Sequence, residues 1–451
     1  MSAGRDCCGE FTRSQLLHAA TSEAGRGLPA IETGMPAPAG TGLSRRSLLL
    51  KGAGLALAVY GSKLALPAFD AGIARAAQPD RILVSVFLDG GLDAMSLLAP
   101  TGDPRYRKLR PHLALPASKT LPFSEDERLR WHPAARNLAK LHGEGKVSVF
   151  PAISYSGPDQ SHFTSRHFYE IGEVEVGSRT GWLGRYLDLV GDDENPLQGI
   201  SLDRALSPTL ATAEKPVAAI NAADGFPMTS DLAEPINTEL FDSFQRLGAL
   251  GADSAGLAQL RSATARTAKL RTDLSGIGDS ESPVRYPDEP MARRLSRLAD
   301  YIGRGLPIRV ATLGGAGGYD THANQAGTLA HNIRRTSDSL YAFQRDLEQR
   351  GLADRVLVQV WSEFGRRPEQ NGSGGTDHGA AGIGMVIGSR AAGTMVGEFP
   401  GLAKLDRLEN LRYTSDFRSM YCSLLEQWLG QDAAEIIPGA ARFDRPVLVK
   451  P

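Results

Sequence analysis

The chain has 451 residues, a formal net charge of -1 and 22% charged side chains. This near-neutral balance gives no electrostatic reason to expect a nucleic-acid partner, and 41% hydrophobic residues are enough to build a large core. Cys7 and Cys8 lie near the N-terminus, ahead of a targeting segment, which leaves Cys422 as the last thiol. One thiol excludes an internal disulfide and a cysteine-built zinc site, so any metal must be held by His, Asp or Glu.

The targeting segment is the first feature in chain order. Residues 44–51 read SRRSLLLK and contain Arg45 and Arg46, the pair typical of a twin-arginine export signal. An apolar stretch follows at 52–66, and Ala-Arg-Ala at 74–76 forms a small-x-small cleavage site. We therefore predict recognition by the twin-arginine translocation machinery and an extracytoplasmic location, which is periplasmic, cell-wall associated or secreted.

The sequence divides into three predicted parts. Residues 1–43 form an extended, disordered n-region, unless translation starts at Met35; residues 44–76 are the signal peptide. Residues 77–451 form a single α/β hydrolase-like domain, with an exposed helical and loop stretch at about 254–288. The lysines around the apolar stretch of the signal enclose only about 11 residues. A spanning helix needs roughly 20, so no stable membrane span is expected.

Short apolar runs alternate with helical patterns along the predicted domain. The runs that favour buried strands are 82–88, 146–152, 308–313, 356–361 and 385–387. The patterns that favour helices are 134–141, 161–171, 290–303 and 329–350. This alternation predicts an α/β fold with a mostly parallel central sheet and helices on both faces. Ligands bind beyond the carboxyl ends of such strands, and the suggestive polar clusters follow these runs.

The first two clusters combine polar groups with turn or helix-start signals. Asp89 ends the first run before Gly90-Gly91, where it can be a metal ligand or only a turn cap. Ser161 opens a predicted helix and is followed by His162. A hydroxyl at this position is either the N-cap of the helix or a nucleophile helped by free N–H groups.

Three later clusters supply metal-type ligands. Asp320 and His322 follow the third run in a glycine-rich loop and offer mixed oxygen and nitrogen ligation. Glu363 leaves the end of a buried run, so it must be paired or metal-bound, and Arg366 is either its ion-pair partner or a clamp for phosphate or sulfate. Asp377 and His378 are adjacent, and such neighbours converge only on an irregular backbone, which the surrounding glycines permit.

Together these motifs resemble the exported bacterial family called domain of unknown function 1501. The resemblance covers roughly residues 81–438 and rests on six motifs: FLDGGLD at 87–93, SHF at 161–163, GWLGR at 181–185, GYDTH at 318–322, SEFGR at 362–366 and GGTDHG at 374–379.

That family is similar in turn to the alkaline phosphatase and sulfatase superfamily, which implies metals at the carboxyl end of a parallel sheet. By this resemblance Asp89 is a ligand after the first strand and Ser161 stands at the nucleophile position. The chain departs from the superfamily at Phe364, where a ligating His is expected, and Asp320 and His322 are two residues apart rather than four. A full two-zinc site is therefore not implied.

The sequence as a whole favours a metal-dependent hydrolase of a small phosphate or sulfate ester. The predicted metal-binding set takes one or two divalent ions, zinc, calcium or magnesium, and consists of Asp89, Asp320, His322, Glu363, Asp377 and His378. The predicted catalytic residues are Ser161, His162 and Arg366, with the last two stabilising the transferring anion. The alternative is a non-catalytic protein of the same fold that binds a cell-envelope ligand.

Overall fold

The computed structural model describes residues 57–60, 80–193, 195–220 and 282–451, with short pieces between 239 and 261. The signal core with Arg45 and Arg46, the cleavage site and most of the 254–288 stretch lie outside these residues. Among the residues that the structure describes, no helix is both long and apolar enough to cross a membrane.

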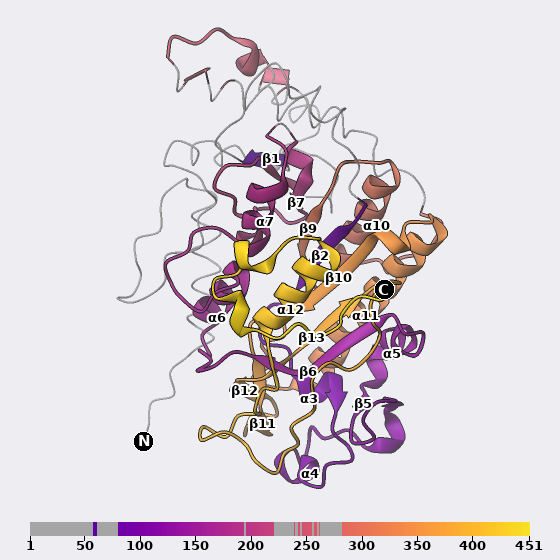
Figure 1. Ribbon diagram of the computed structural model, residues 1–451. Helices are drawn as coiled ribbons and strands as arrows, with labels where there is room; N and C mark the ends of the chain where they lie inside the picture. The colour runs from indigo at the N-terminus through magenta and orange to yellow at the C-terminus, as the bar shows by residue number, and fades with distance from the viewer. Residues whose placement is uncertain are drawn as a thin grey trace.

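A nine-stranded sheet forms the centre of the molecule (Figure 1). In spatial order its strands are β1 (Leu57–Tyr60), β8 (Val217–Ile220), β7 (Gly199–Ser201), β9 (Val310–Gly314), β2 (Ile82–Phe87), β10 (Val356–Trp361), β13 (Gly382–Ile387), β6 (Val147–Ser154) and β14 (Ser415–Asp416). Strands β8, β7, β9, β2 and β10 are mutually parallel, whereas β1 and β13 pair antiparallel with their neighbours. The expected mostly parallel sheet is confirmed.

The two faces of the sheet carry separate hydrophobic cores. Ile82, Val84 and Val86 of β2 face one core, and Leu83 faces the other, because successive side chains of a strand point to opposite sides. The first core is covered by α5 (Arg136–Gly143), α10 (Pro290–Gly303) and α11 (Gln325–Gln349). The second is covered by α6 (His162–Ile171), α7 (Trp182–Val190) and α12 (Phe417–Ser423). Helices on both faces confirm the predicted α/β class.

The helix boundaries follow local sequence signals. Helix α6 begins after Ser161, whose hydroxyl accepts a hydrogen bond from the Phe163 N–H, as the N-cap reading requires. Helix α10 begins at Pro290, which fits the first helical turn because its missing N–H has no intrahelical partner there. Helix α11 starts at Gln325, four residues before the predicted start, and buries Gln325 completely.

Several elements were not predicted from the sequence. They include the sheet strands β7 and β8, and the hairpin formed by β11 (Gly365–Gln370) and β12 (Thr376–Gly379). A second small sheet contains β3 (Leu98–Ala99), β5 (Arg130–Trp131) and β4 (Leu121–Pro122), and short helices lie at α3 (Ala94–Leu97) and α4 (Tyr106–Leu109). These strands are short or lack an apolar run, so no periodicity marks them.

Candidate metal centre

The predicted site residues meet at the carboxyl ends of the central strands. Asp89 follows β2, Asp320 follows β9 and Glu363 follows β10, and these three strands are parallel neighbours. The hairpin β11–β12 brings His378 to the same edge, and α6 contributes His162 as its first residue. The topology therefore gathers groups that are far apart in the sequence, as expected for an open α/β sheet.

Glu363 is completely buried and fully hydrogen-bonded. Its Oε1 and Oε2 atoms accept the backbone N–H groups of Gly90 and Gly91 at 2.9–3.2 Å, and Oε2 accepts the Ser362 hydroxyl at 3.0 Å. Its Oε1 lies 2.7 Å from Nδ1 of His162. Burial alone would raise the pKa of Glu363, but the hydrogen bond and charge of His162, together with backbone N–H donors, outweigh burial and lower this pKa. The Glu363 carboxylate is thus held in its ionised form next to Nδ1 of His162.

Gly90 permits this arrangement because the backbone approaches another loop closely. Its φ is +105°, a conformation that side chains disfavour, and a Cβ atom there would lie 2.5 Å from the backbone nitrogen of Asp320. The glycine turn after β2 therefore packs directly on the loop that carries Asp320. The glycines of the motif at 87–93 are explained by this close contact and by the backbone N–H groups that donate to Glu363.

Asp320 is the central acceptor of the site. Its Oδ1 accepts Nη2 of Arg366 at 2.5 Å and lies 2.9 Å from Nε2 of His322 and 3.4 Å from Nε2 of His378. Its Oδ2 faces Nε2 of His162 at 3.6 Å. Burial opposes ionisation, but the contacts with His162, His322, His378 and Arg366 outweigh it and hold the pKa of Asp320 well below its ordinary value.

Arg366 has its guanidinium fully engaged inside the chain. Besides Asp320, its N–H groups donate to the carbonyls of Gly90, Gly91 and Thr376 at 2.6–2.9 Å. Its side chain has no exposed surface. The sequence left open whether Arg366 pairs with Glu363 or clamps an anion; its carboxylate partner is Asp320, and the donors are directed into the protein. The geometry favours a positioning role for Arg366 over contact with a substrate anion.

His322 and His378 approach each other through their Nε2 atoms, which are 3.0 Å apart. Nδ1 of His378 lies 2.8 Å from the Gln160 carbonyl, and Nδ1 of His322 lies 3.2 Å from Oδ1 of Asp377. A carbonyl accepts only, so Nδ1 of His378 carries the proton and Nε2 of its neutral ring has a lone pair. His322 has a carboxylate on each side, Asp377 at Nδ1 and Asp320 at Nε2, so these contacts do not select its tautomer. Burial lowers the pKa of His378, which favours its neutral form. A metal ion placed between the two Nε2 atoms would be bound by a lone pair from each ring.

His162 completes a set of three similarly held imidazoles. Each has Nδ1 against an acceptor, namely Glu363, Asp377 or the Gln160 carbonyl, and each directs Nε2 to Asp320. Ligating imidazoles in metalloproteins are oriented in this way through their second nitrogen. One ligand atom from each of His162, Asp320 and His378 lies within 4.8 Å of the others, which suits a metal ion. Nitrogen and carboxylate donors of this kind fit zinc better than calcium or magnesium.

The remaining predicted residues lie around this cluster in different roles. Asp377 and His378 are in strand β12, so their side chains point to opposite sides, and Asp377 is 56% exposed. The pairing of β12 with β11 is nevertheless irregular, since the register shifts between Arg366 and Gln370, and both Asp377 and His378 contact His322. Burial, with the charge of Glu363, raises the pKa of Asp89 to about 6. Ser161 is half-buried and caps α6 next to His162.

Sequence reasoning missed three features of the cluster. The Gln160 carbonyl that orients His378 has no side-chain signal, and backbone acceptors cannot be found from composition. The hydrogen bonds from the Gly90 and Gly91 N–H groups to Glu363 likewise cannot be predicted before the fold is known. Gln325 accepts hydrogen bonds from Thr321 and Thr376, which lie beside the candidate ligands in the sequence, but Gln325 itself belongs to no recognisable motif.

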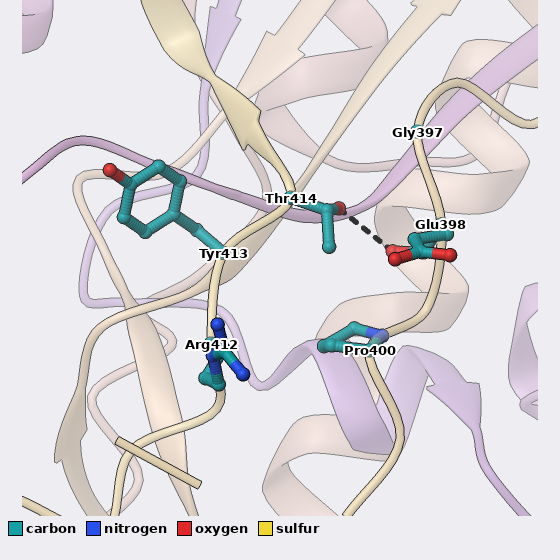
Figure 2. A pocket seen from close by; sticks show the side chains of 6 residues that line it. All are labelled: Gly397, Glu398, Pro400, Arg412, Tyr413 and Thr414. Carbon is teal, nitrogen blue, oxygen red and sulfur yellow. Dashed lines mark hydrogen bonds between the residues drawn. The ribbon is translucent and has the colours of Figure 1, made fainter. Parts of the chain in front are cut away.

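A hollow of about 630 Å³ lies outside the cluster (Figure 2). It is lined by Gly397, Glu398, Pro400, Arg412, Tyr413 and Thr414, and the Thr414 hydroxyl donates to the Glu398 carbonyl at 2.8 Å. None of these residues belongs to the histidine cluster. We therefore place the candidate site at the edge of the sheet and not in this hollow.

The fold and the cluster define an α/β protein with a histidine and carboxylate centre at the carboxyl edge of its sheet. A family model described as "Protein of unknown function (DUF1501)" matches residues 150–425, so the chain belongs to this family. The comparison with curated proteins found no match.

Among solved structures, the chain is similar to a sulfatase from Pseudoalteromonas sp., with 12% identity, TM-score 0.36, and coverage of 85% of this chain and 75% of that one. It is similar to the soluble domain of lipooligosaccharide phosphoethanolamine transferase A from Neisseria meningitidis, with 11% identity, TM-score 0.35, and coverage of 85% and 96%. A phosphonate monoester hydrolase from Silicibacter pomeroyi gives 12% identity, TM-score 0.34, and coverage of 81% and 75%. Similarity at this level does not transfer an activity to this chain.

Proposed function

We propose that the protein is a metal-dependent hydrolase of phosphate or sulfate esters with one divalent ion, most suitably zinc, at His162, Asp320 and His378. The observation that carries the proposal is the common orientation of three imidazoles, with Nδ1 bound to an acceptor and Nε2 directed to one carboxylate. His322 lies beside these ligands and can join or replace one of them.

The carboxylates assigned to the metal from sequence divide into two groups in this proposal. Asp320 faces the imidazole Nε2 atoms and is a ligand, whereas Glu363 and Asp377 hold the Nδ1 sides of His162 and His322. A carboxylate in that position fixes the tautomer and increases the basicity of the ligating nitrogen. Asp89 remains a candidate ligand because it follows the end of the neighbouring strand β2. The charges of Arg166 and Glu363 both affect the pKa of its carboxyl group.

Catalysis requires an attacking oxygen near this centre. When bound, the ion would polarise the ester oxygen and lower the pKa of a coordinated hydroxyl or water. Ser161 precedes the ligand His162 and lies at the N-terminus of α6, where free N–H groups stabilise an anion. Its hydroxyl also caps the helix, so Ser161 and a water molecule are both candidates for the attacking group.

Metal content together with turnover tests this proposal. Protein purified from the exported fraction should hold close to one equivalent of zinc and hydrolyse an aryl phosphate or aryl sulfate. His378→Ala should lose both properties, whereas His331→Ala, which changes an exposed histidine on α11, should keep both. Wild-type protein with well under one equivalent of any divalent ion would refute the metal site. Tight metal binding without turnover would instead support the non-catalytic binding protein.

We further propose export by the twin-arginine route, because Arg45 and Arg46 form the core of the signal motif. Replacing both by lysine should retain the precursor in the cytoplasm, and the exported protein should begin near Ala77. N-terminal sequencing of the exported protein checks the cleavage site. Retention of residues before Arg45 in that protein would contradict the assignment.

A further inference from the structure

The two chain segments that carry the candidate ligands are joined behind the site by one side chain. Gln325 is completely buried at the start of α11. Its Oε1 accepts the hydroxyl of Thr321 at 3.1 Å and the hydroxyl of Thr376 at 2.7 Å. Thr321 stands between Asp320 and His322, and Thr376 precedes Asp377 and His378 by one and two positions. A single amide oxygen thus contacts both segments.

The other end of the same amide is anchored to a buried ion pair. Nε2 of Gln325 donates to Oδ2 of Asp93 at 2.6 Å and to the Ser96 hydroxyl at 3.3 Å. Asp93 is bound by both terminal nitrogens of Arg110, at 2.6 and 3.0 Å. The amide therefore uses two donor and two acceptor positions, which is its full hydrogen-bonding capacity. A fully satisfied buried polar network of this kind holds its members in one arrangement.

The backbone around this contact is correspondingly close. The N–H of Thr376 donates to the Thr321 carbonyl at 3.2 Å, and the N–H of Gln325 donates to the Gly374 carbonyl at 2.9 Å. At Gly375 a Cβ atom would lie 2.2 Å from the carbonyl carbon of His322, so no larger residue fits there. The Nε2 separation of 3.0 Å between His322 and His378 depends on this approach, because each imidazole extends from one of the two segments.

We propose that Gln325 is a positioning residue that sets the spacing between the Asp320–His322 segment and the His378 strand, and thereby the metal affinity of the site. This inference rests on the proposed metal site. Gln325 does not contact the ligating atoms; it acts through Thr321 and Thr376. Loss of a residue that orients metal ligands typically weakens metal binding by about 10- to 100-fold.

Two glutamine variants on the same helix provide a matched test. Gln325→Leu removes the bridge, and Gln344→Leu removes a buried amide whose Nε2 donates to Glu348 and Ser389, away from the site. Zinc affinity, measured by competition with a chelator, should fall about 10- to 100-fold in the first variant and change less than about 2-fold in the second. Equal effects of the two variants, or wild-type affinity in Gln325→Leu, would overturn the proposal.

A second readout does not depend on the metal. In chelator-treated protein, hydrogen–deuterium exchange should accelerate at both 318–326 and 372–380 in Gln325→Leu but in neither segment of Gln344→Leu. Unchanged exchange refutes the bridge even if zinc binds, and absence of zinc from the wild type refutes the metal site without deciding the bridge.

A milder pair of variants covers the case in which Gln325→Leu does not fold. Thr376→Val removes one hydroxyl at nearly constant volume and should accelerate exchange at 372–380, whereas Thr376→Ser keeps the hydroxyl and should restore wild-type exchange. Identical exchange in these two variants would contradict the role given to the Gln325 contact.

Discussion

Arg110 and Arg366, both within the part of the chain that the structure describes, are completely buried and pair with aspartates, but their surroundings differ. Arg110 binds Asp93 through two nitrogens, and the remaining oxygen contacts of Asp93 come from neutral Ser96 and Gln325. Arg366 binds Asp320 through one nitrogen, and three imidazoles occupy the rest of that carboxylate. The Asp93 side chain is 1% exposed and the Asp320 side chain 13% exposed.

The difference separates a structural ion pair from a candidate site. Around Asp93 the charges and hydrogen bonds are balanced within the protein, so a further ligand has nothing to bind. Around Asp320 four nitrogen-bearing side chains converge on one carboxylate, and the Nε2 atoms of His322 and His378 face each other at 3.0 Å. A buried polar cluster that is satisfied by its own residues stabilises the fold, whereas one in which several imidazole Nε2 atoms converge on a carboxylate has the donor set of a metal site.

Breaking the Arg110 pair should have the largest effect on stability. Arg110→Met leaves the Asp93 carboxylate buried without its cation, and such a change typically costs about 3–5 kcal/mol. Urea unfolding should show this loss with or without zinc. In Arg366→Met, by contrast, added zinc should recover part of the loss, because a cation next to Asp320 replaces the missing charge. The distinction between the two pairs would be contradicted if zinc restored the unfolding free energy of Arg110→Met, or if zinc did not restore any of it in Arg366→Met.

A surface pair serves as the control for that measurement. Arg293 binds Asp288 at 2.8 Å, and the two side chains are 44% and 99% exposed. Arg293→Met should therefore change the unfolding free energy by less than about 1 kcal/mol.

Removing a proposed ligand should affect the metal far more than the fold. We expect His378→Ala to weaken zinc binding by at least about 100-fold, or about 2.7 kcal/mol, because a ligand is lost from a small set. The melting temperature should then respond little to added zinc, since stabilisation by a ligand depends on its affinity. Calorimetry with and without zinc measures both quantities. A normal zinc-dependent shift in His378→Ala would remove His378 from the site.

The pH dependence of the metal-free protein should reveal the charge on His162. Burial lowers the pKa of this imidazole, but the nearby Asp320 carboxylate and the hydrogen-bonded Glu363 carboxylate outweigh burial and raise it from 6.5 to about 9. The stability from protonated His162 is therefore fully present below about pH 6.5 and is lost as the pH rises through about 9. Urea unfolding of chelator-treated protein should show this decline, and His162→Gln should flatten it. A decline unchanged in His162→Gln would assign the effect to other groups.

Apart from the surface control, the smallest stability effect is expected at Ser161. Its capping hydrogen bond predicts a loss of about 1 kcal/mol in Ser161→Ala and tolerance of Ser161→Asp, because both Ser and Asp cap helices well. If Ser161 is also the attacking group, Ser161→Ala should keep its metal and lose turnover of aryl phosphate or aryl sulfate. Turnover near the wild-type rate in this variant would leave a metal-bound water as the attacking group.

Much of the fold could be predicted because buried strands and amphipathic helices leave a periodic trace. The run at 356–361 and the helix at 290–303 have the predicted bounds, since apolar side chains and Pro290 mark them. The hairpin β11–β12 could not be predicted in the same way. Its strands contain charged and small residues, and their burial comes from contacts with distant loops and not from a hydrophobic pattern.

By itself the sequence determined the α/β class and which polar residues would stand at strand ends. It predicted Asp320, His322, Glu363 and His378 as metal ligands, because these residue types follow buried runs beside glycines. Only the tertiary structure decided their arrangement. It paired Arg366 with Asp320, placed Glu363 behind His162, and used Gln325 as a bridge between two segments. Such contacts join residues that are 46 and 201 positions apart, and no local pattern encodes which distant groups will meet.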